Sequence, residues 1–278
     1  MLKPEPVYDI PIHLLGAFRG RRVILRSSDP AEVISTVKES EIPDVVGIRL
    51  TELTSDSAIL HKWGEGVPVE LSLSRPNTEF QYLYRHVKLL DHHPVRLRVL
   101  LANGAARALK LAASLRFPVK IDVNQPDAEA ITELQAILDF YLHNSGVAEP
   151  VEFFHSVLVA MLSDQETTLW EILEENPAFV RYVNDEGIEM MIRSKVGCAL
   201  VTTGLEYFIE EFVAELFREN AECCSCEFFK CCGGYFKWPL KKFRCSETKQ
   251  VFETLKLAAL DLRADLAEYR LATAEVTQ

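Results

Sequence analysis

The protein has 278 residues, of which 48% are hydrophobic and 26% are charged. This composition is typical of a soluble globular protein and excludes a wholly disordered chain, and the length allows one large domain or a domain with an appendage. The formal net charge of −11 argues against broad binding to nucleic acids, which requires a positive surface. The sequence contains no apolar run long enough to span a membrane and no export signal at its start, so we expect a cytoplasmic protein.

The first half of the chain alternates between short strand-like segments and helical patterns. Strands are expected at Arg21–Arg26, Val45–Leu50, Val67–Leu73, Val95–Leu101 and Phe117–Val123. This alternation predicts an α/β fold with βαβ units and a mainly parallel sheet, either open or curved into part of a barrel. No glycine-rich phosphate loop follows these strands, so nucleotide binding of the dinucleotide-fold and P-loop types is unsupported.

Helix signals follow several of the strands. Asp29 is expected to cap a helix, with Pro30 at its first position and Glu32 completing a capping box. A second helix is expected to begin at Asn77 or Thr78. Its apolar face is predicted to consist of Phe80, Leu83, Tyr84 and Val87. Further helices are expected after the fourth and fifth strands.

The pattern changes near Glu149. From there to about residue 200 the sequence predicts two helices, a turn at Asn184–Gly187 and a short strand. An amphipathic helix follows at Leu205–Arg218. A last amphipathic helix is expected to be lined by Val251, Leu255, Ala258, Leu262, Leu266 and Tyr269. We therefore divide the chain into a βα partial-barrel domain at 1–148, a bridging region at 149–200 and a cysteine-rich domain at 201–278.

Six of the seven cysteines lie between Cys223 and Cys245. In a reducing compartment such thiols stay free for metal binding or catalysis. Cys223 and Cys226 form a C-x2-C pair, Cys231 or Cys232 can supply a third thiolate, and Cys245 can supply a fourth. We predict a metal site formed by Cys223, Cys226, Cys231 and Cys245, with Cys224 and Cys232 as alternates. The seventh cysteine, Cys198, is expected to be a buried structural thiol.

The residues around the cysteines suit a metal centre. Gly233-Gly234 allows a close backbone approach, through which N–H groups could reach cluster sulfurs. Aromatic side chains would limit water access, and nearby cations would stabilise an anionic centre. These are Phe228, Phe229, Tyr235, Phe236 and Trp238, and Lys230, Lys237, Lys241, Lys242 and Arg244. Four thiolates serve a structural zinc, a [2Fe–2S] or a [4Fe–4S] cluster, and the spacing does not decide between them.

The pattern Cys223-x2-Cys226-x4-Cys231-x-Gly-Gly resembles the C-terminal SPASM segment of radical SAM peptide maturases. In that family, similar patterns ligate an auxiliary [4Fe–4S] cluster. The βα units up to about Asn144 resemble the partial barrel of a radical SAM core, and the following segment resembles its bridge to the SPASM region. The resemblance implies a partial (βα) barrel with a C-terminal helical SPASM-like domain, and a [4Fe–4S] cluster as the cofactor.

Two features depart from the family pattern. Tyr235 follows the glycine pair where the usual motif has a cysteine, so Cys245 or Cys232 would complete the set. Radical SAM enzymes also bind their catalytic cluster through Cys-x3-Cys-x2-Cys near the N-terminus, whereas no cysteine precedes Cys198 here. The resemblance therefore implies a member that keeps the auxiliary cluster and has lost the catalytic one. We assign no catalytic residue and do not expect autonomous radical chemistry.

Other polar residues are weaker candidates. His92 and His93 precede a strand and are expected to be solvated loop residues, and His155 is expected in a core or an interface. Asp122 and Asn124 lie at the C-terminal end of a strand, where ligand sites of α/β folds gather. They are the candidates for lining a ligand pocket.

Three functions remain open from the sequence. The preferred hypothesis is a non-catalytic iron–sulfur protein that is the partner or accessory of a radical SAM peptide-modification system and contacts the maturase or its precursor peptide. The second is a zinc-stapled cytosolic interaction domain without a redox role. The third is an enzyme with an active site in the barrel mouth that uses the cluster as an electron donor. Neither nucleic acid nor membrane is an expected partner.

Overall fold

A computed structural model describes residues 5–191 and 204–276. Its centre is a nine-stranded sheet in the order β7-β6-β5-β4-β3-β2-β1-β8-β9. Neighbouring strands are parallel except β8 and β9, which are antiparallel. The strands are β1 (Val7–Pro11), β2 (Val23–Ser27), β3 (Val45–Leu50), β4 (Val69–Leu73), β5 (Val95–Leu100), β6 (Val119–Asp122), β7 (Val151–Glu152), β8 (Val180–Val183) and β9 (Glu189–Met190). The predicted parallel α/β sheet is confirmed.

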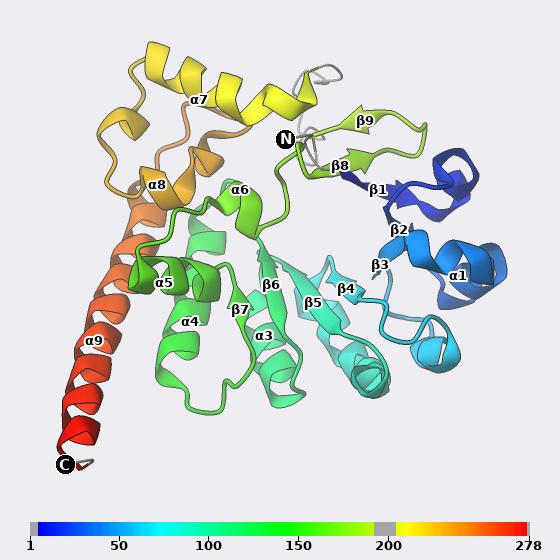
Figure 1. The fold of residues 1–278 in the computed structure, drawn as a ribbon, viewed down its shortest axis with the longest axis horizontal. Coiled ribbons are helices and arrows are strands. Elements are labelled where there is room, and N and C mark those ends of the chain that lie inside the picture. Colours follow the sequence, from blue (N-terminus) through cyan, green and yellow to red (C-terminus); the bar gives the residue numbers. More distant parts are fainter. Residues whose placement is uncertain (1–4, 192–203, 277–278) are drawn as a thin grey trace.

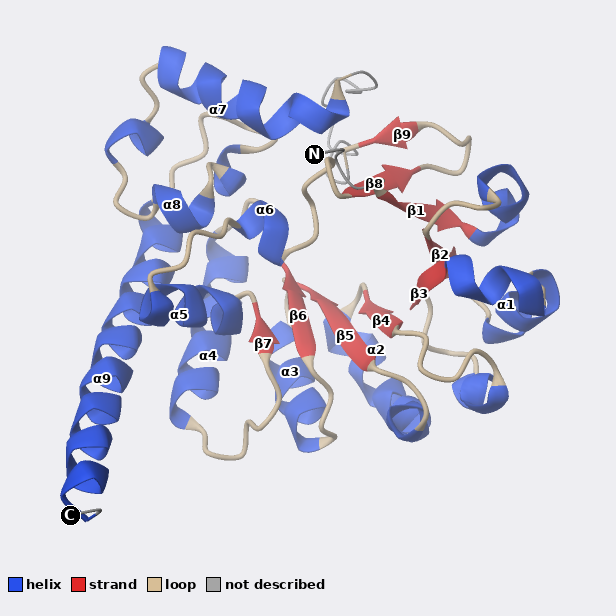
Figure 2. Ribbon diagram, in the orientation of Figure 1, coloured by secondary structure: helices blue, strands red, loops and turns tan. Residues whose placement is uncertain are grey.

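Helical segments follow the strands and lie outside the curved sheet, while the C-terminal third forms a separate group of helices beside β7 (Figure 1, Figure 2). The α-helices are α1 (Pro30–Thr36), α2 (Pro76–Glu79), α3 (Ala105–Ser114), α4 (Ala128–His143), α5 (Phe154–Ser163), α6 (Leu169–Ile172), α7 (Phe208–Arg218), α8 (Phe229–Cys232) and α9 (Ser246–Val276). The 3₁₀ segments are η1 (Ile12–Phe18), η2 (Glu39–Asp44), η3 (Ser57–Lys62), η4 (Phe80–Asp91), η5 (Leu205–Tyr207), η6 (Glu222–Ser225) and η7 (Tyr235–Lys237).

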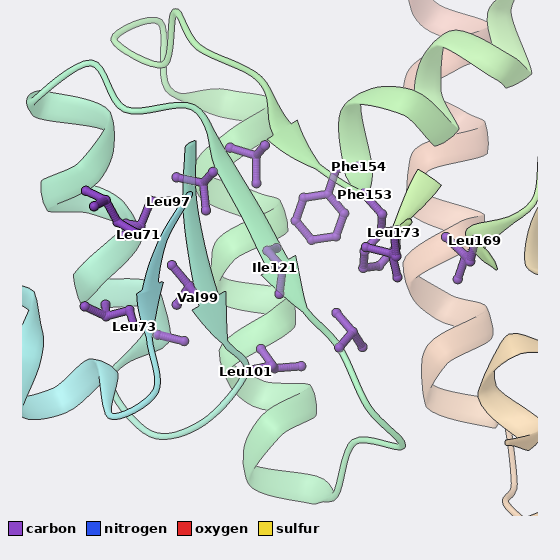
Figure 3. Packing of buried hydrophobic residues seen from close by; sticks show 14 of the residues in the cluster. Leu71, Leu73, Leu97, Val99, Leu101, Ile121, Phe153, Phe154, Leu169 and Leu173 are labelled. Atoms are coloured by element: carbon purple, nitrogen blue, oxygen red, sulfur yellow. The ribbon is translucent and has the colours of Figure 1, made fainter. Parts of the chain in front are cut away.

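The hydrophobic core lies between the outer face of the sheet and the helices. Alternate residues of a strand point to opposite faces, and the outward ones here are apolar. Leu71, Leu97, Val99 and Ile121 are fully buried in this layer (Figure 3). Arg98 on β5 and Lys120 on β6 are next to these apolar residues in sequence; they face inward and are charged. The strands therefore separate an apolar outer layer from a polar interior.

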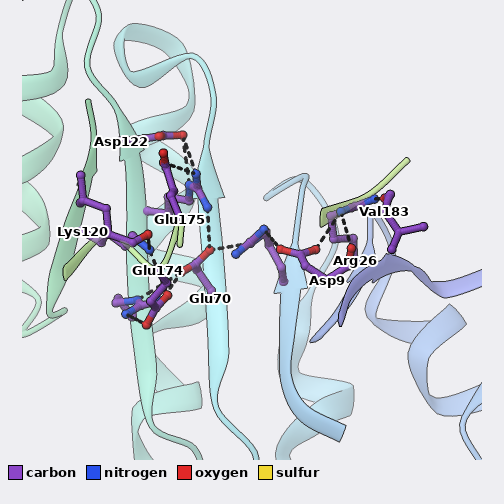
Figure 4. A network of polar contacts seen from close by, with 12 residues as sticks. Asp9, Arg26, Glu70, Lys120, Asp122, Glu174, Glu175 and Val183 are labelled. Carbon is purple, nitrogen blue, oxygen red and sulfur yellow. Dashed lines mark hydrogen bonds and ion pairs between the residues drawn. The ribbon is translucent and has the colours of Figure 1, made fainter. Parts of the chain in front are cut away.

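The chain crosses from one edge of the sheet toward the other after β7. It passes through α5 and α6 and returns as β8, which pairs in parallel with β1 from Val7↔Val180 to Asp9↔Tyr182. Strands β7, β8 and β9 thus extend the sheet with residues from beyond position 148. The crossing segment also sends Glu174 and Glu175 into the interior of the partial barrel (Figure 4).

Several local predictions need correction. Strands β1 and β8 were not expected, because each is short and carries charged residues within or beside it. The second helical segment begins at Pro76, and Tyr84 is 63% exposed instead of lining its apolar face. Asp29 does cap α1 by accepting the Ala31 N–H at 2.9 Å. Glu32 does not complete a capping box; it accepts a hydrogen bond from the Ser27 hydroxyl instead.

The predicted C-terminal helices are present as α7 and α9. The first part of α9 packs on α5 and α4, where Val251 and Leu255 are buried. The later residues of its expected apolar face, Leu262, Leu266 and Tyr269, are exposed, because the helix extends past the body of the protein. The apolar face of α9 is therefore covered only in its first part. Within the described residues, no helix combines the length and apolar character needed to span a membrane.

Candidate metal centre and charged barrel interior

The cysteine segment is held between α7 and α9 by short turns. It follows α7 through η6, turns into α8 and then into η7, and ends at Cys245 immediately before α9. Its middle docks onto the C-terminal end of β6. The Tyr235 hydroxyl donates to the Val123 carbonyl at 3.1 Å, and the Gln125 amide donates to the Phe236 and Leu240 carbonyls, each at 2.8 Å. The segment therefore has a fixed position against the barrel.

Four of the six clustered cysteines line one small cavity in this segment. They are Cys223, Cys226, Cys232 and Cys245. The free volume inside is about 20 Å³. Apolar walls are supplied by Phe228, Phe229, Phe236 and Phe252. Across the described residues, no three His, Cys, Asp or Glu side chains are already arranged to hold a metal ion, so the four sulfurs surround a space without forming a closed ligand set.

The other cysteines lie elsewhere. Cys231, which was predicted as a ligand, lines a different cavity between α5 and α9, and Cys224 is exposed. The alternate Cys232 takes the place expected for Cys231. The two are neighbours on α8, and successive helical residues point about 100° apart, so only one can face the cavity. Cys198 lies outside the described residues. The ligand set itself stays a prediction.

The backbone after α8 is arranged around the sulfur of Cys232. The N–H groups of Gly234, Tyr235 and Phe236 point toward it. Gly233 and Gly234 have φ values of +60° and +74°, which let the chain turn so that successive N–H groups converge. The glycine pair thus brings backbone N–H groups to the Cys232 thiol, and their contact with a cluster stays a prediction. Such a nest of donors favours an anionic sulfur.

Burial opposes ionisation of the free thiols. It raises the pKa of Cys232 to about 11 and that of Cys245 to about 12, and it also raises the pKa of Cys223. The ammonium group of Lys237 lowers the pKa values of Cys223 and Cys245 but does not cancel the effect of burial. A metal ion bound here would displace protons from these thiols, and its binding would therefore weaken as pH falls.

An ion pair between a buried lysine and an exposed glutamate lies next to the thiols. Lys237 is 4% exposed; its Nζ donates to Glu222 Oε1 at 2.5 Å and to the Phe243 carbonyl. Glu222 also accepts Lys249 Nζ at 3.0 Å and the Cys245 N–H at 3.2 Å. Burial works to raise the pKa of Glu222, but these hydrogen bonds hold it at about 2. The pair thus places a fixed positive charge beside Cys223 and Cys245.

The interior of the partial barrel is filled by a continuous ion-pair network (Figure 4). Its members are Asp9, Glu70, Asp122, Glu174 and Glu175, and Arg26, Arg49, Arg96, Arg98 and Lys120, which balance in charge. Arg49 bridges Asp9 and Glu70, with its Nε 2.5 Å from Glu70 Oε1. Arg96 donates to both Glu70 and Glu174, in each case with an oxygen at 2.6 Å.

Burial and charge act against each other in this network. Burial works to raise the pKa of Glu70, but the surrounding arginines hold it well below its ordinary value. In Glu174, burial likewise opposes ionisation, but the hydrogen bonds and charges of Arg96 and Lys120 bring its pKa to about 2. The carboxylates therefore stay ionised at neutral pH. The sequence did carry a signal for this interior, because charged residues recur at alternate positions in strands such as VRLRVL and VKID.

The remaining candidates have structural partners. Asp122 accepts Arg98 Nε at 3.0 Å as part of the network, while Asn124 lines a separate pocket of about 180 Å³ near the ends of β5 and β6. The structure therefore does not bring these two together in one site. His93 is buried, with its ring nitrogens 3.0 Å from the Val67 and Leu60 carbonyls, so its predicted solvation was wrong. His155 is exposed, 3.2 Å from the Tyr141 hydroxyl, so a core position is wrong and an interface position stays a prediction.

Comparison with known proteins finds a similarity in fold. No protein-family model and no curated protein matches the sequence. Among solved structures, the chain is similar to one described as native anSMEcpe with bound AdoMet and Cp18Cys peptide. The two chains are 12% identical, with a TM-score of 0.54, and the similarity covers 92% of this chain and 89% of the other. The two chains accordingly share a fold, which here is a parallel α/β partial barrel with a C-terminal helical region.

Proposed function

We propose that the protein is a non-catalytic iron–sulfur protein that serves as an accessory of a radical SAM peptide-modification system. The observation that carries the proposal is the convergence of Cys223, Cys226, Cys232 and Cys245 on one apolar cavity. The likeness in fold to a chain solved with AdoMet and a peptide supports the choice of system. The absence of any cysteine before Cys198 in the sequence supports a non-catalytic role.

The residue types around the cavity suit an auxiliary cluster, for which the thiols would have to move apart. Cys223, Cys226, Cys232 and Cys245 would hold it, and when bound it would supply one-electron redox chemistry or bracing of the fold. The amide nest at Cys232 and the Lys237 ammonium would offset the negative charge of four thiolates. The phenylalanine walls would keep water away and so strengthen these interactions. The thiols would lose their protons on loading.

The fold also suggests where a partner would act. The cysteine segment is fixed to the end of β6 by Tyr235 and Gln125, so a cluster here would keep a constant position relative to the barrel. A maturase or its precursor peptide bound at this end would meet the centre at a defined place. The ion-pair network supplies a rigid support for that geometry, because its charged groups satisfy one another inside the barrel.

Zinc is the second candidate, and the size of the cavity favours it. A free volume of about 20 Å³ can accept one ion, whereas an iron–sulfur cluster requires the thiols to move apart. Four thiolates about 2.3 Å from a single zinc would form a closed structural site. The protein would then be a zinc-stapled interaction domain. An active site in the barrel mouth, the third hypothesis, gains no support from an interior occupied by ion pairs.

Anaerobic purification with iron, sulfide and zinc analysis tests the proposal. We expect brown protein with about four iron and four sulfide per chain. Cys232→Ser should lose the iron, and the matched variant Cys231→Ser should keep it, since Cys231 lines another cavity. Colourless protein with one zinc per chain would refute the iron–sulfur assignment. Equal iron in both variants and in the wild type would refute the proposed ligand set.

A further inference from the structure

A large cavity lies at the end of the barrel opposite the usual site. Ligands of parallel α/β folds bind at the C-terminal ends of the strands. This cavity, of about 810 Å³, instead opens among residues at the N-terminal ends of β1, β3, β4, β5 and β8. These residues are Val7, Val46, Val69, Val95 and Val180. Its volume is within the range of about 300–1,000 Å³ typical of small-molecule sites.

The wall of the cavity is mostly apolar, and the charged groups deeper in it are already paired. Ile24, Ile48 and Pro68 add to the valines that form the wall. Glu70 and Arg96 also face the cavity, but they are bound to each other. A ligand body in contact with this surface is therefore expected to be apolar, because the paired groups offer it few free hydrogen-bonding positions.

Two oppositely charged side chains lie at the rim of the cavity, and their pairing differs from that of the charged groups inside. Arg116 lies three residues before the start of β6, and Glu149 lies two residues before the start of β7. Arg116 is exposed and Glu149 is half-buried. Within the described part of the chain, neither side chain has a hydrogen bond or ion pair. Because β6 and β7 are paired neighbours, the rim presents a cation and an anion on the segments that lead into two adjacent strands.

We infer that this cavity binds a small zwitterion with a bulky apolar body, the chemistry of a large apolar α-amino acid. The carboxylate binds Arg116, the ammonium binds Glu149, and the apolar part extends toward the strand ends. Both head-group contacts are charge-assisted hydrogen bonds, which are stronger than neutral ones. The site is separate from the cysteine cavity and does not rest on the proposed function of that cavity.

Gly47 offers a position at which a larger side chain would enter the cavity without backbone strain. It lies in the wall on β3, and a Cβ added there would meet the Pro68 carbonyl oxygen at 3.5 Å and Ile24 Cγ1 at 3.9 Å, both ordinary contacts. Its φ is not among the positive values of this chain, so a side chain adds no backbone strain. Gly47→Leu should place a bulky side chain against the bound apolar body, and Gly47→Ala is the matched control.

The test is calorimetric titration with three probes that share one apolar body: O-benzyl-L-tyrosine, its N-acetyl derivative and its amide. The zwitterion should bind one per chain and at least tenfold more tightly than either derivative. Arg116→Gln should weaken the zwitterion about tenfold and leave the amide unchanged, since the amide has no carboxylate. Glu149→Gln should do the same for the zwitterion and leave the N-acetyl derivative unchanged.

The variants also define what would overturn the inference. Gly47→Leu should weaken all three probes while Gly47→Ala leaves their affinities unchanged, with circular dichroism and melting used to verify folding. Affinities that Gly47→Leu leaves unchanged would place the probes elsewhere. No saturable binding of the zwitterion, or equal affinity for a singly charged derivative, would also overturn the inference. Cys232→Ser should bind the zwitterion as the wild type does, which separates this site from the metal centre.

Discussion

Neutralising Glu70 tests the ion-pair network most directly. Glu70 is 7% exposed and its carboxylate receives Arg49 and Arg96 at 2.5–3.1 Å, with Arg98 at 3.7 Å. In Glu70→Gln these guanidinium groups lose their shared carboxylate inside the barrel. An uncompensated buried charge is the main reason that breaking a buried pair costs about 3–5 kcal/mol.

The expected loss lies at the lower end of that range. Each arginine keeps another carboxylate: Asp9 for Arg49, Glu174 for Arg96 and Asp122 for Arg98. We therefore expect the free energy of unfolding to fall by about 3 kcal/mol. At this chain length about 1 kcal/mol corresponds to roughly 2 °C, so the melting temperature should fall by about 6 °C.

Urea unfolding at pH 7 and calorimetry measure this change. The matched control is Glu166→Gln, which removes an ion pair with Lys230 whose two side chains are 78% and 79% exposed. Exposed pairs contribute little, so this variant should melt as the wild type does. If Glu70→Gln and Glu166→Gln lower stability equally, the claim that the buried network holds the barrel together is wrong.

Three further changes should have definite outcomes. Stability should be constant above about pH 5 and fall as pH drops from 4.5 toward 2, because the folded-state pKa of Glu174 is about 2 and that of Glu70 is also lowered. Urea unfolding midpoints between pH 6 and pH 3 measure this change, and Glu70→Gln should lose less stability over the same range. Lys237→Met should lower the midpoint potential of a bound cluster, because it removes the cation beside Cys245. Lys242→Met, at an exposed position, should leave the potential unchanged, and equal potentials of the two variants in a redox titration would contradict the electrostatic role of Lys237. Gly233→Ala should lower the melting temperature, because the added Cβ would lie 3.0 Å from Thr168 Cβ and the residue has a φ of +60°. Gly16→Ala, whose Cβ would have nothing within 4 Å, should not, and identical melting of the two variants would show that the loop relaxes freely.

The sequence by itself determined the features that depend on local pattern. Segments such as Val45–Leu50 are short and rich in β-branched residues, and this composition favours a strand. The apolar spacing of Leu205–Arg218 specifies a helix in the same way. The clustering of cysteines between Cys223 and Cys245 is likewise visible without a structure, and the metal centre that it indicates stays a prediction.

Only the tertiary structure decided which side chains meet. Cys231 and Cys232 are equivalent as sequence neighbours, but α8 turns one toward the cavity and the other away. The pairing of β1 with β8 joins residues more than 170 positions apart, and no local preference specifies such a contact. The same long-range packing brings Glu174 against Arg96. Local spacing fixes the face on which a residue lies, whereas its partner depends on how distant segments fold together.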